Sequence, residues 1–147
     1  MRYLGLYLDK QLNFSHHAKL VIDSLYGHLC TVSKILANHP CELNPATIIS
    51  IYKARSRSKM EYALIFYQSK NIVQRLQKIQ NKFIRLALQC SRHSSLDIIQ
   101  LIMHVEPVRF RVIYLQMRFY VRFMYAESYH LLFNHRQQLM NLSLIHI

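Results

Sequence analysis

The sequence predicts a mainly α-helical, basic domain that begins with one short strand and continues as a bundle of four to five helices. Glycine occurs twice and proline three times in 147 residues, which leaves too little turn chemistry for a β-sandwich or a barrel. Hydrophobic residues make up 52% of the chain and charged residues 18%, so the chain has enough apolar material for a packed core. The length is typical of a single domain.

The first element predicted is the strand. Residues 2–9 alternate between the two faces of a strand and are rich in Tyr and Leu. A lone strand leaves its backbone hydrogen-bonding groups without partners. We therefore expect its neighbouring strands to lie outside this chain, which is a first indication of a fragment.

The remaining elements are predicted from apolar residues that recur at helical spacing. Ser15 is a candidate cap for the first helix, and Asn44-Pro45 is a strong helix start because Asn caps well and Pro suits the first helical position. The breaks between helices are the Asn38–Cys41 turn and the Ser91–Ser95 loop. The predicted helices cover residues 16–38, 45–67, 71–89, 95–104 and 107–133.

Positive charge dominates the surface that these helices would expose. Lys and Arg number 19 against seven Asp and Glu, a net charge of +12. One basic row falls within an arc of about 80° beside the apolar face of the third helix, and a second row follows the last helix. A solvated helix face normally carries both signs, but no acid occurs between Asn71 and Gln89. We therefore predict nucleic-acid contacts by Arg75, Lys78, Lys82, Arg85, Arg111, Arg118 and Arg122, with Arg136 at the end of the second row.

No catalytic centre is predicted. Two-metal phosphoryl transfer needs two or three carboxylates that converge on cations about 4 Å apart, and no two acids of this chain form an adjacent or alternate pair. No Ser or Cys lies in a recognisable nucleophile motif. We expect no catalytic residues and no cofactor in this chain.

The cysteines predict neither a disulfide framework nor a metal site. Three cysteines without a Cys-x-x-Cys pair favour a reducing, intracellular compartment. His39-x-Cys41 and Cys90-x-x-His93 are the alternative, a four-ligand zinc site, but neither half has the usual spacing and Cys90 suits a core equally well. We predict no metal ligands.

The most apolar segment, residues 110–133, is broken by arginines and predicts no membrane span. Its aromatic residues follow helical spacing, which favours core or interface packing. Stacking on nucleic-acid bases and binding to an anionic membrane surface are the alternatives. The aromatic residues are Tyr114, Phe119, Tyr120, Phe123 and Tyr125.

Four motifs occur in an order that resembles one protein family. They are Tyr3-Leu4-Gly5-x-x-Leu8-Asp9 with Leu12-Asn13-Phe14-x-x-His17; Ile51-Tyr52-Lys53-Ala54 with Arg57-Ser58-Lys59-Met60-Glu61-Tyr62; Leu76-x-x-Ile79-Gln80-Asn81-Lys82-Phe83-Ile84-Arg85; and Pro107-Val108 with Arg109 and Arg111. The series, from about Arg2 to Phe123, resembles the region just after the catalytic palm in reverse transcriptases of non-LTR retrotransposons. Jockey-like mobile elements are the nearest type.

The resemblance implies a division of the chain. It places the last palm strand and a connection in residues 1–14, a helical thumb in 15–104, a C-terminal connection helix in 105–136 and a tail, interpreted as non-native, in 137–147. The family's catalytic aspartates lie upstream and have no counterpart here, so Mg²⁺ is expected only for the full-length enzyme. Gln89 stands where the family commonly has glycine, and Ser94-Ser95 lacks the usual following proline.

The predicted function is that of a C-terminal fragment of an RNA-directed DNA polymerase. As a thumb, it would bind an RNA/DNA duplex through backbone phosphates and pack against the missing palm and fingers, in the nucleus or the cytoplasm. Alone it is expected to have no polymerase activity. The alternatives are a non-enzymatic basic helical module that binds nucleic acid or protein, and an inert transposon relic.

Overall fold

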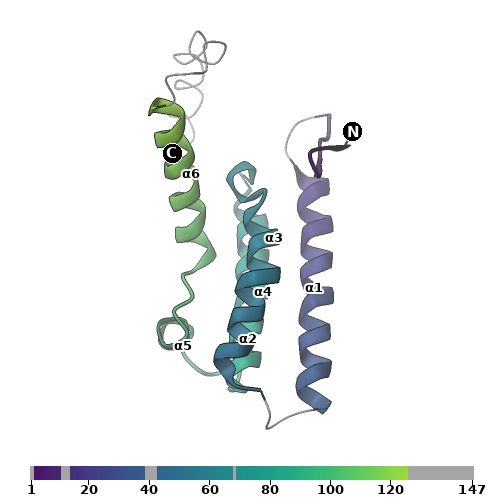
Figure 1. Ribbon diagram of the computed structural model, residues 1–147, viewed down its shortest axis with the longest axis vertical. Helices are drawn as coiled ribbons and strands as arrows, with labels where there is room; N and C mark the ends of the chain where they lie inside the picture. Colours follow the sequence, from purple (N-terminus) through teal and green to yellow (C-terminus); the bar gives the residue numbers. More distant parts are fainter. Residues whose placement is uncertain (1, 11–13, 39–42, 68, 126–147) are drawn as a thin grey trace. The chain divides into compact units, whose positions relative to one another are not determined.

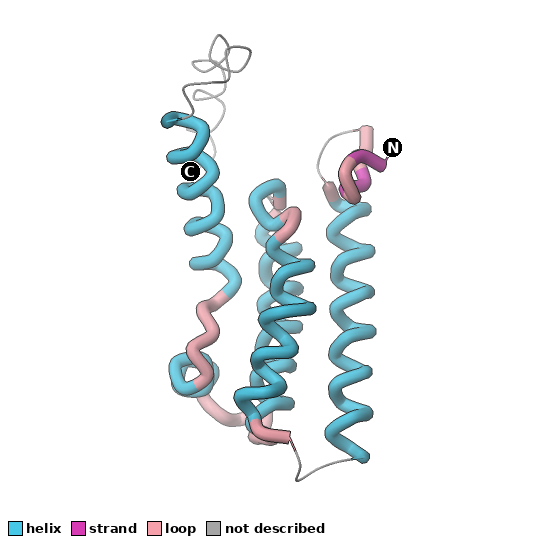
Figure 2. Tube along the Cα trace, in the orientation of Figure 1, coloured by secondary structure: helices cyan, strands magenta, loops and turns pink. Residues whose placement is uncertain are grey.

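The computed structural model describes residues 2–10, 14–38, 43–67 and 69–125 of the protein (Figure 1). Helices dominate these residues (Figure 2), so the predicted mainly α-helical class is confirmed. The elements in chain order are β1 (Arg2–Tyr3), β2 (Leu6–Tyr7), α1 (Ser15–Asn38), α2 (Pro45–Ile51), the π-helical turn η1 (Tyr52–Arg57), α3 (Ser58–Glu61), the 3₁₀ turn η2 (Leu64–Phe66), α4 (Lys70–Leu88), α5 (Leu96–Ile102) and α6 (Val108–Tyr125).

The chain divides into two compact units, Met1–Leu115 and Gln116–Ile147. In the first unit α4 packs against both α1 and α2, and Figure 1 shows these helices side by side. The core between them is apolar and fully buried around Leu76, Phe83 and Ile84 of α4. The division predicted at residues 14, 104 and 136 stays a prediction.

The N-terminal segment corrects one prediction. Residues 2–9 do not form a single strand, because the chain turns back at Leu4-Gly5 and β1 pairs with β2 in an antiparallel hairpin. Leu4 and Gly5 both have positive φ, 46° and 83°, the conformation that tight hairpin turns require. The Tyr62 hydroxyl donates a hydrogen bond to the Leu4 carbonyl oxygen. Each short strand therefore has a partner within the described residues, and the strands expected from outside the chain stay a prediction.

Helix α1 is long and apolar enough, by length and composition, to cross a membrane, and among the described residues no other helix is. The core helix of a soluble protein passes the same test. Here Val21, Ile22 and Leu25 of α1 are buried in the first unit. The apolar stripe of α1 is thus used in packing against its neighbours.

The second helix begins as predicted and ends earlier than predicted. The Asn44 side chain accepts a hydrogen bond from the Ala46 amide at 2.9 Å, and Pro45 is the first helical residue. The helix continues through the π-helical turn to Glu61, whereas residues up to 67 were predicted to be helical. A separate 3₁₀ turn follows at residues 64–66.

A buried polar chain ties the helices together. The Tyr52 hydroxyl donates to Oε1 of Gln80 at 2.8 Å, and Nε2 of Gln80 donates to the Glu106 carbonyl oxygen at 2.9 Å. Tyr52 and Gln80 are 2% and 1% exposed, so each of their buried polar side-chain atoms needs a hydrogen-bond partner. These bonds hold the segment before α6 against α4.

His17 is buried near the rings of Tyr7 and Tyr67, whose centroids both lie 6.3 Å from the His17 ring. Neither nitrogen of His17 has a hydrogen-bond partner among the described residues, and the Tyr67 hydroxyl has none either. Burial, with a smaller effect of His16, lowers the pKa of His17 below its ordinary value of 6.5. The folded state therefore favours the neutral imidazole.

We expect the free energy of unfolding to fall as the pH drops below about 6.5, since the unfolded chain then binds protons that folded His17 does not. Substitution His17→Phe should flatten this dependence and stabilise the protein by about 1 kcal/mol, because it removes unpaired polar atoms. His28, whose pKa is also lowered by burial and by nearby cations, keeps a share of the dependence. Urea denaturation between pH 5 and 7.5 measures it. His93→Gln, in an exposed loop, is the control, and equal slopes for His17→Phe and wild type would contradict the assignment.

Helix α4 ends at Gln89, the position at which the family that the sequence resembles commonly has glycine. Gln89 has φ 49° and ψ 33°, the left-handed conformation of a helix C-cap. Its amide donates to the carbonyl oxygens of Arg85 and Leu86, which closes the helix. An L-residue in this conformation costs roughly 1–2 kcal/mol that glycine avoids.

Substitution Gln89→Gly should therefore raise the free energy of unfolding by about 1 kcal/mol. Gln74→Gly, at an exposed position inside the same helix, is the matched control and should lower it by a similar amount. Urea denaturation of both variants checks the prediction. A loss of stability in both would show that the left-handed cap is not strained.

The last helix was predicted to run from Pro107 through residue 133. Helix α6 covers Val108–Tyr125, and residues 126–133 lie outside the described part of the chain. The same holds for Arg136 and for the predicted tail, residues 137–147.

Candidate functional site

Helix α4 presents an open basic face. Its apolar residues Ile72, Leu76 and Ile79 are buried, and the opposite side is exposed. No acidic residue occurs anywhere in α4. Three cations, Arg75, Lys78 and Lys82, lie on the exposed side and span about 10 Å along the helix axis. We call these three residues the α4 basic face.

The α4 basic face borders α1. The ammonium of Lys82 lies over the ring of Tyr26, 5.0 Å from its centroid. Tyr26 is 38% exposed, so part of its ring is still open to a ligand. An aromatic ring beside a row of cations is the combination that nucleic-acid-binding surfaces use for backbone and base contacts.

Arg85 differs from the three cations of the α4 basic face. Its side chain is half-buried, and its Nη2 donates to the Ser94 carbonyl oxygen at 3.5 Å. Its Nε is buried and makes no hydrogen bond to any described residue. Arg85 thus faces the loop after α4, a contact that helical spacing could not reveal.

Arg111 is held in an ion pair. Its Nε and Nη2 donate to the two carboxylate oxygens of Glu61 at 2.8 and 3.0 Å. The hydrogen bond to Glu61, against the opposing effect of burial, raises the pKa of Arg111. Unlike Arg75 or Lys78, this guanidinium already has a bidentate carboxylate partner.

The other two predicted cations, Arg118 and Arg122, belong to the second unit. Both are exposed on α6, as are the aromatic residues Phe119 and Tyr120 between them. Their four-residue separation places the two arginines on one side of the helix. Among the described residues, Arg118 and Arg122 have no carboxylate ion pair.

A four-membered ion cluster in the first unit was not predicted. The Glu61 carboxylate also accepts from Nε of Arg57 at 2.7 Å, and Glu106 lies 3.4 Å from Nη2 of Arg57 and 4.0 Å from Nη1 of Arg111. Burial alone would raise the pKa of Glu61, but the hydrogen bonds from Arg111 and Arg57 lower it. The i,i+4 spacing of Arg57 and Glu61 was visible in the sequence. The pairing of residues 50 positions apart was not.

Metal-ligating and nucleophilic side chains are dispersed. No group of three or more His, Cys, Asp or Glu that could hold a metal ion occurs in the part of the chain that the structure describes. Cys90 is half-buried against the core, while His93 is exposed in the following loop. His39 and Cys41, the other half of the alternative zinc site, lie outside the described residues.

No protein-family model, no curated protein and no solved structure matches this chain. The resemblance to reverse transcriptases therefore stands on the four sequence motifs alone.

Proposed function

We propose that this protein binds the sugar–phosphate backbone of a nucleic-acid duplex through the α4 basic face. The observation that carries the proposal is a helix face with Arg75, Lys78 and Lys82 exposed in a row and no acidic residue in the helix. Rows of Lys and Arg bind phosphates by charge and release condensed counterions, so this binding does not depend on the base sequence of the nucleic acid. The net charge of +12 adds a long-range attraction to polyanions.

The finer proposal is that the chain is the thumb and connection of a reverse transcriptase from a non-LTR retrotransposon. Its support is the ordered series of motifs between Arg2 and Phe123. In this reading the duplex is the primer–template hybrid, and the missing palm supplies the catalytic aspartates and Mg²⁺. The chain by itself then binds the hybrid without extending a primer.

The second candidate is a non-enzymatic module that binds nucleic acid on its own. It is favoured by the packing of the first unit, in which β1 pairs with β2 and the helices share one buried core. A cooperative thermal melt of the isolated chain, followed by circular dichroism, favours a folded domain, whether a thumb or an independent module. A gradual, aggregating melt favours an inert relic.

The direct test of nucleic-acid binding is fluorescence anisotropy with a labelled RNA–DNA hybrid between 50 and 200 mM salt. We expect the logarithm of the affinity to fall linearly with the logarithm of the salt concentration, by about 0.9 for each phosphate contacted. Competition with double-stranded DNA and single-stranded RNA then ranks the ligands. An affinity that does not depend on salt, or no binding at 50 mM, overturns the proposal.

A further inference from the structure

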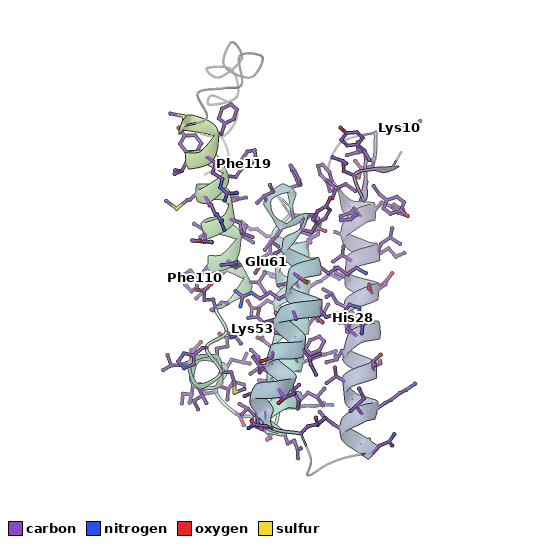
Figure 3. All side chains as sticks on the ribbon, viewed as in Figure 1. Lys10, His28, Lys53, Glu61, Phe110 and Phe119 are labelled. Atoms are coloured by element: carbon purple, nitrogen blue, oxygen red, sulfur yellow. The ribbon has the colours of Figure 1, made fainter. Side chains whose placement is uncertain are left out.

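A second basic site lies in the first unit and contains no residue of α4. It is an open groove of about 360 Å³ that is lined by Lys53, Arg57, Ser58, His104 and Arg111, together with the two carboxylates of the ion cluster. The groove has side chains from η1, α3, the segment before α6, and the first turn of α6. Figure 3 labels Lys53 and Glu61, which belong to the continuous helical stretch formed by η1 and α3.

The local backbone explains why these cations meet. Lys53, Arg57 and Glu61 are spaced four residues apart along the continuous stretch of η1 and α3, so they follow one side of it. Arg111 extends from α6 into the same groove, and its guanidinium forms an ion pair with Glu61 there. The groove is thus built by residues that the tertiary fold brings together.

The charges in the groove do not balance. Three cations, Lys53, Arg57 and Arg111, face two carboxylates, and the two carboxylates are held very differently. The side chain of Glu61 is 19% exposed and accepts hydrogen bonds from arginine nitrogens at 2.7, 2.8 and 3.0 Å. The side chain of Glu106 is 63% exposed and only 3.4 and 4.0 Å from its nearest arginine nitrogens. Lys53 is exposed and has no ion pair among the described residues.

Such a site favours an anion with more charge than a carboxylate. A ligand that displaces Glu106 must interact with the arginines more strongly than a monoanion does. A phosphate group carries close to two charges at pH 7 and three acceptor oxygens, and guanidinium groups bind it in a bidentate manner. Lys53 supplies the unpaired charge that compensates the second negative charge.

We propose that this groove binds a phosphate group in its dianionic form, as inorganic phosphate or as a phosphomonoester. Lys53 and the outward N–H groups of Arg57 and Arg111 donate to its oxygens. Glu61 remains in place and orients both arginines, while the Glu106 carboxylate moves out to solvent. Glu106 is therefore a competitor for the site, and its removal strengthens binding.

The test is a titration of the full chain with inorganic phosphate at pH 7.5 and constant ionic strength, followed by calorimetry and by backbone amide shifts in NMR. Lys53→Gln should weaken binding about tenfold, the effect of one charge-assisted hydrogen bond. Glu106→Gln should tighten it severalfold. Lys34→Gln, an exposed lysine of α1, is the matched control and should leave the affinity unchanged. The three residues are exposed, and a melting curve of each variant verifies the fold.

The opposite signs of the two groove variants make the result decisive. Equal weakening in Lys53→Gln and Lys34→Gln, or amide shifts confined to α4, would overturn the groove and assign the phosphate to the general positive surface. An affinity for phosphate that Glu106→Gln leaves unchanged would show that Glu106 does not compete for the site. At pH 5.5, where phosphate is mostly a monoanion, the affinity should fall.

Two sources of the phosphate can be told apart with oligonucleotides that carry either a 5′-phosphate or a 5′-hydroxyl. A preference for the 5′-phosphate that Lys53→Gln abolishes supports the end of a nucleic-acid strand as the occupant. Binding of inorganic phosphate without that preference supports a small phosphorylated molecule. Because neither variant touches the α4 basic face, duplex binding through that face can fail or succeed independently of the groove.

Discussion

Replacing Glu61 by glutamine should lower the free energy of unfolding by about 3 kcal/mol. Glu61 is the tight acceptor for two guanidinium groups, those of Arg57 and Arg111, whose side chains are 12% and 26% exposed. Glutamine keeps the shape and one acceptor oxygen but removes the charge, so Arg57 and Arg111 keep only the exposed and more distant carboxylate of Glu106 as a counterion. The same change releases the first turn of α6 from α3.

Urea denaturation at pH 7 measures this loss, and Asp23→Asn is the control because Asp23 is an exposed acid in the middle of α1. The control should change stability by less than about 0.5 kcal/mol. The lowered pKa of Glu61 means that its contribution is present above its ordinary pKa of 4.5 and is lost as the pH falls through the lower value of the folded state. The wild-type protein should therefore lose the contribution of Glu61 to the free energy of unfolding in acid, and the Glu61→Gln variant should show no such loss. Equal effects of the two substitutions would show that the ion cluster does not stabilise the fold.

Replacing all three residues of the α4 basic face by glutamine should weaken binding to an RNA–DNA hybrid by about two orders of magnitude at 0.1 M salt. The salt slope should fall by about 2.7, because each of the three cations that binds a phosphate accounts for about 0.9 of it. Glutamine has nearly the helix propensity of Lys and Arg, so α4 should keep its structure. Anisotropy titrations at four salt concentrations supply both quantities.

The matched control carries the same loss of charge at three exposed lysines outside α4, in the triple variant Lys10→Gln, Lys34→Gln and Lys59→Gln. It should lose only the long-range attraction, so its salt slope should stay close to that of wild type. Two triple variants with equal losses would mean that net charge, and not the α4 basic face, attracts the nucleic acid.

Local patterns were reliable where one element decides the outcome. The Asn44-Pro45 pair predicted the start of α2 because a side-chain cap and a fixed φ act within two residues. The period of Ile72, Leu76 and Ile79 predicted which side of α4 is buried, and hence that Arg75, Lys78 and Lys82 are exposed. A helix of this length turns one face inward whatever it packs against.

Sequence patterns gave wrong predictions where the structure depends on backbone conformations that the residue types do not indicate. Residues 2–9 resemble one strand because Leu4 is an unusual residue for a left-handed turn position, and only Gly5 signals the hairpin. The second helix ends at Glu61 although apolar residues continue through residue 67, because the chain bends there to bury Leu64 and Tyr67. These apolar residues fit either a helix or a buried turn.

The sequence by itself determined the helical class, the order of the helices and the α4 basic face, since each depends on residues three or four positions apart. The tertiary structure alone decided which arginines remain open. Arg85 and Arg111 follow the same spacing as the exposed cations, yet one contacts the Ser94 carbonyl and the other pairs with Glu61, 50 residues away. Helical periodicity assigns a side chain to a face, but only the packing of other elements determines what that face meets.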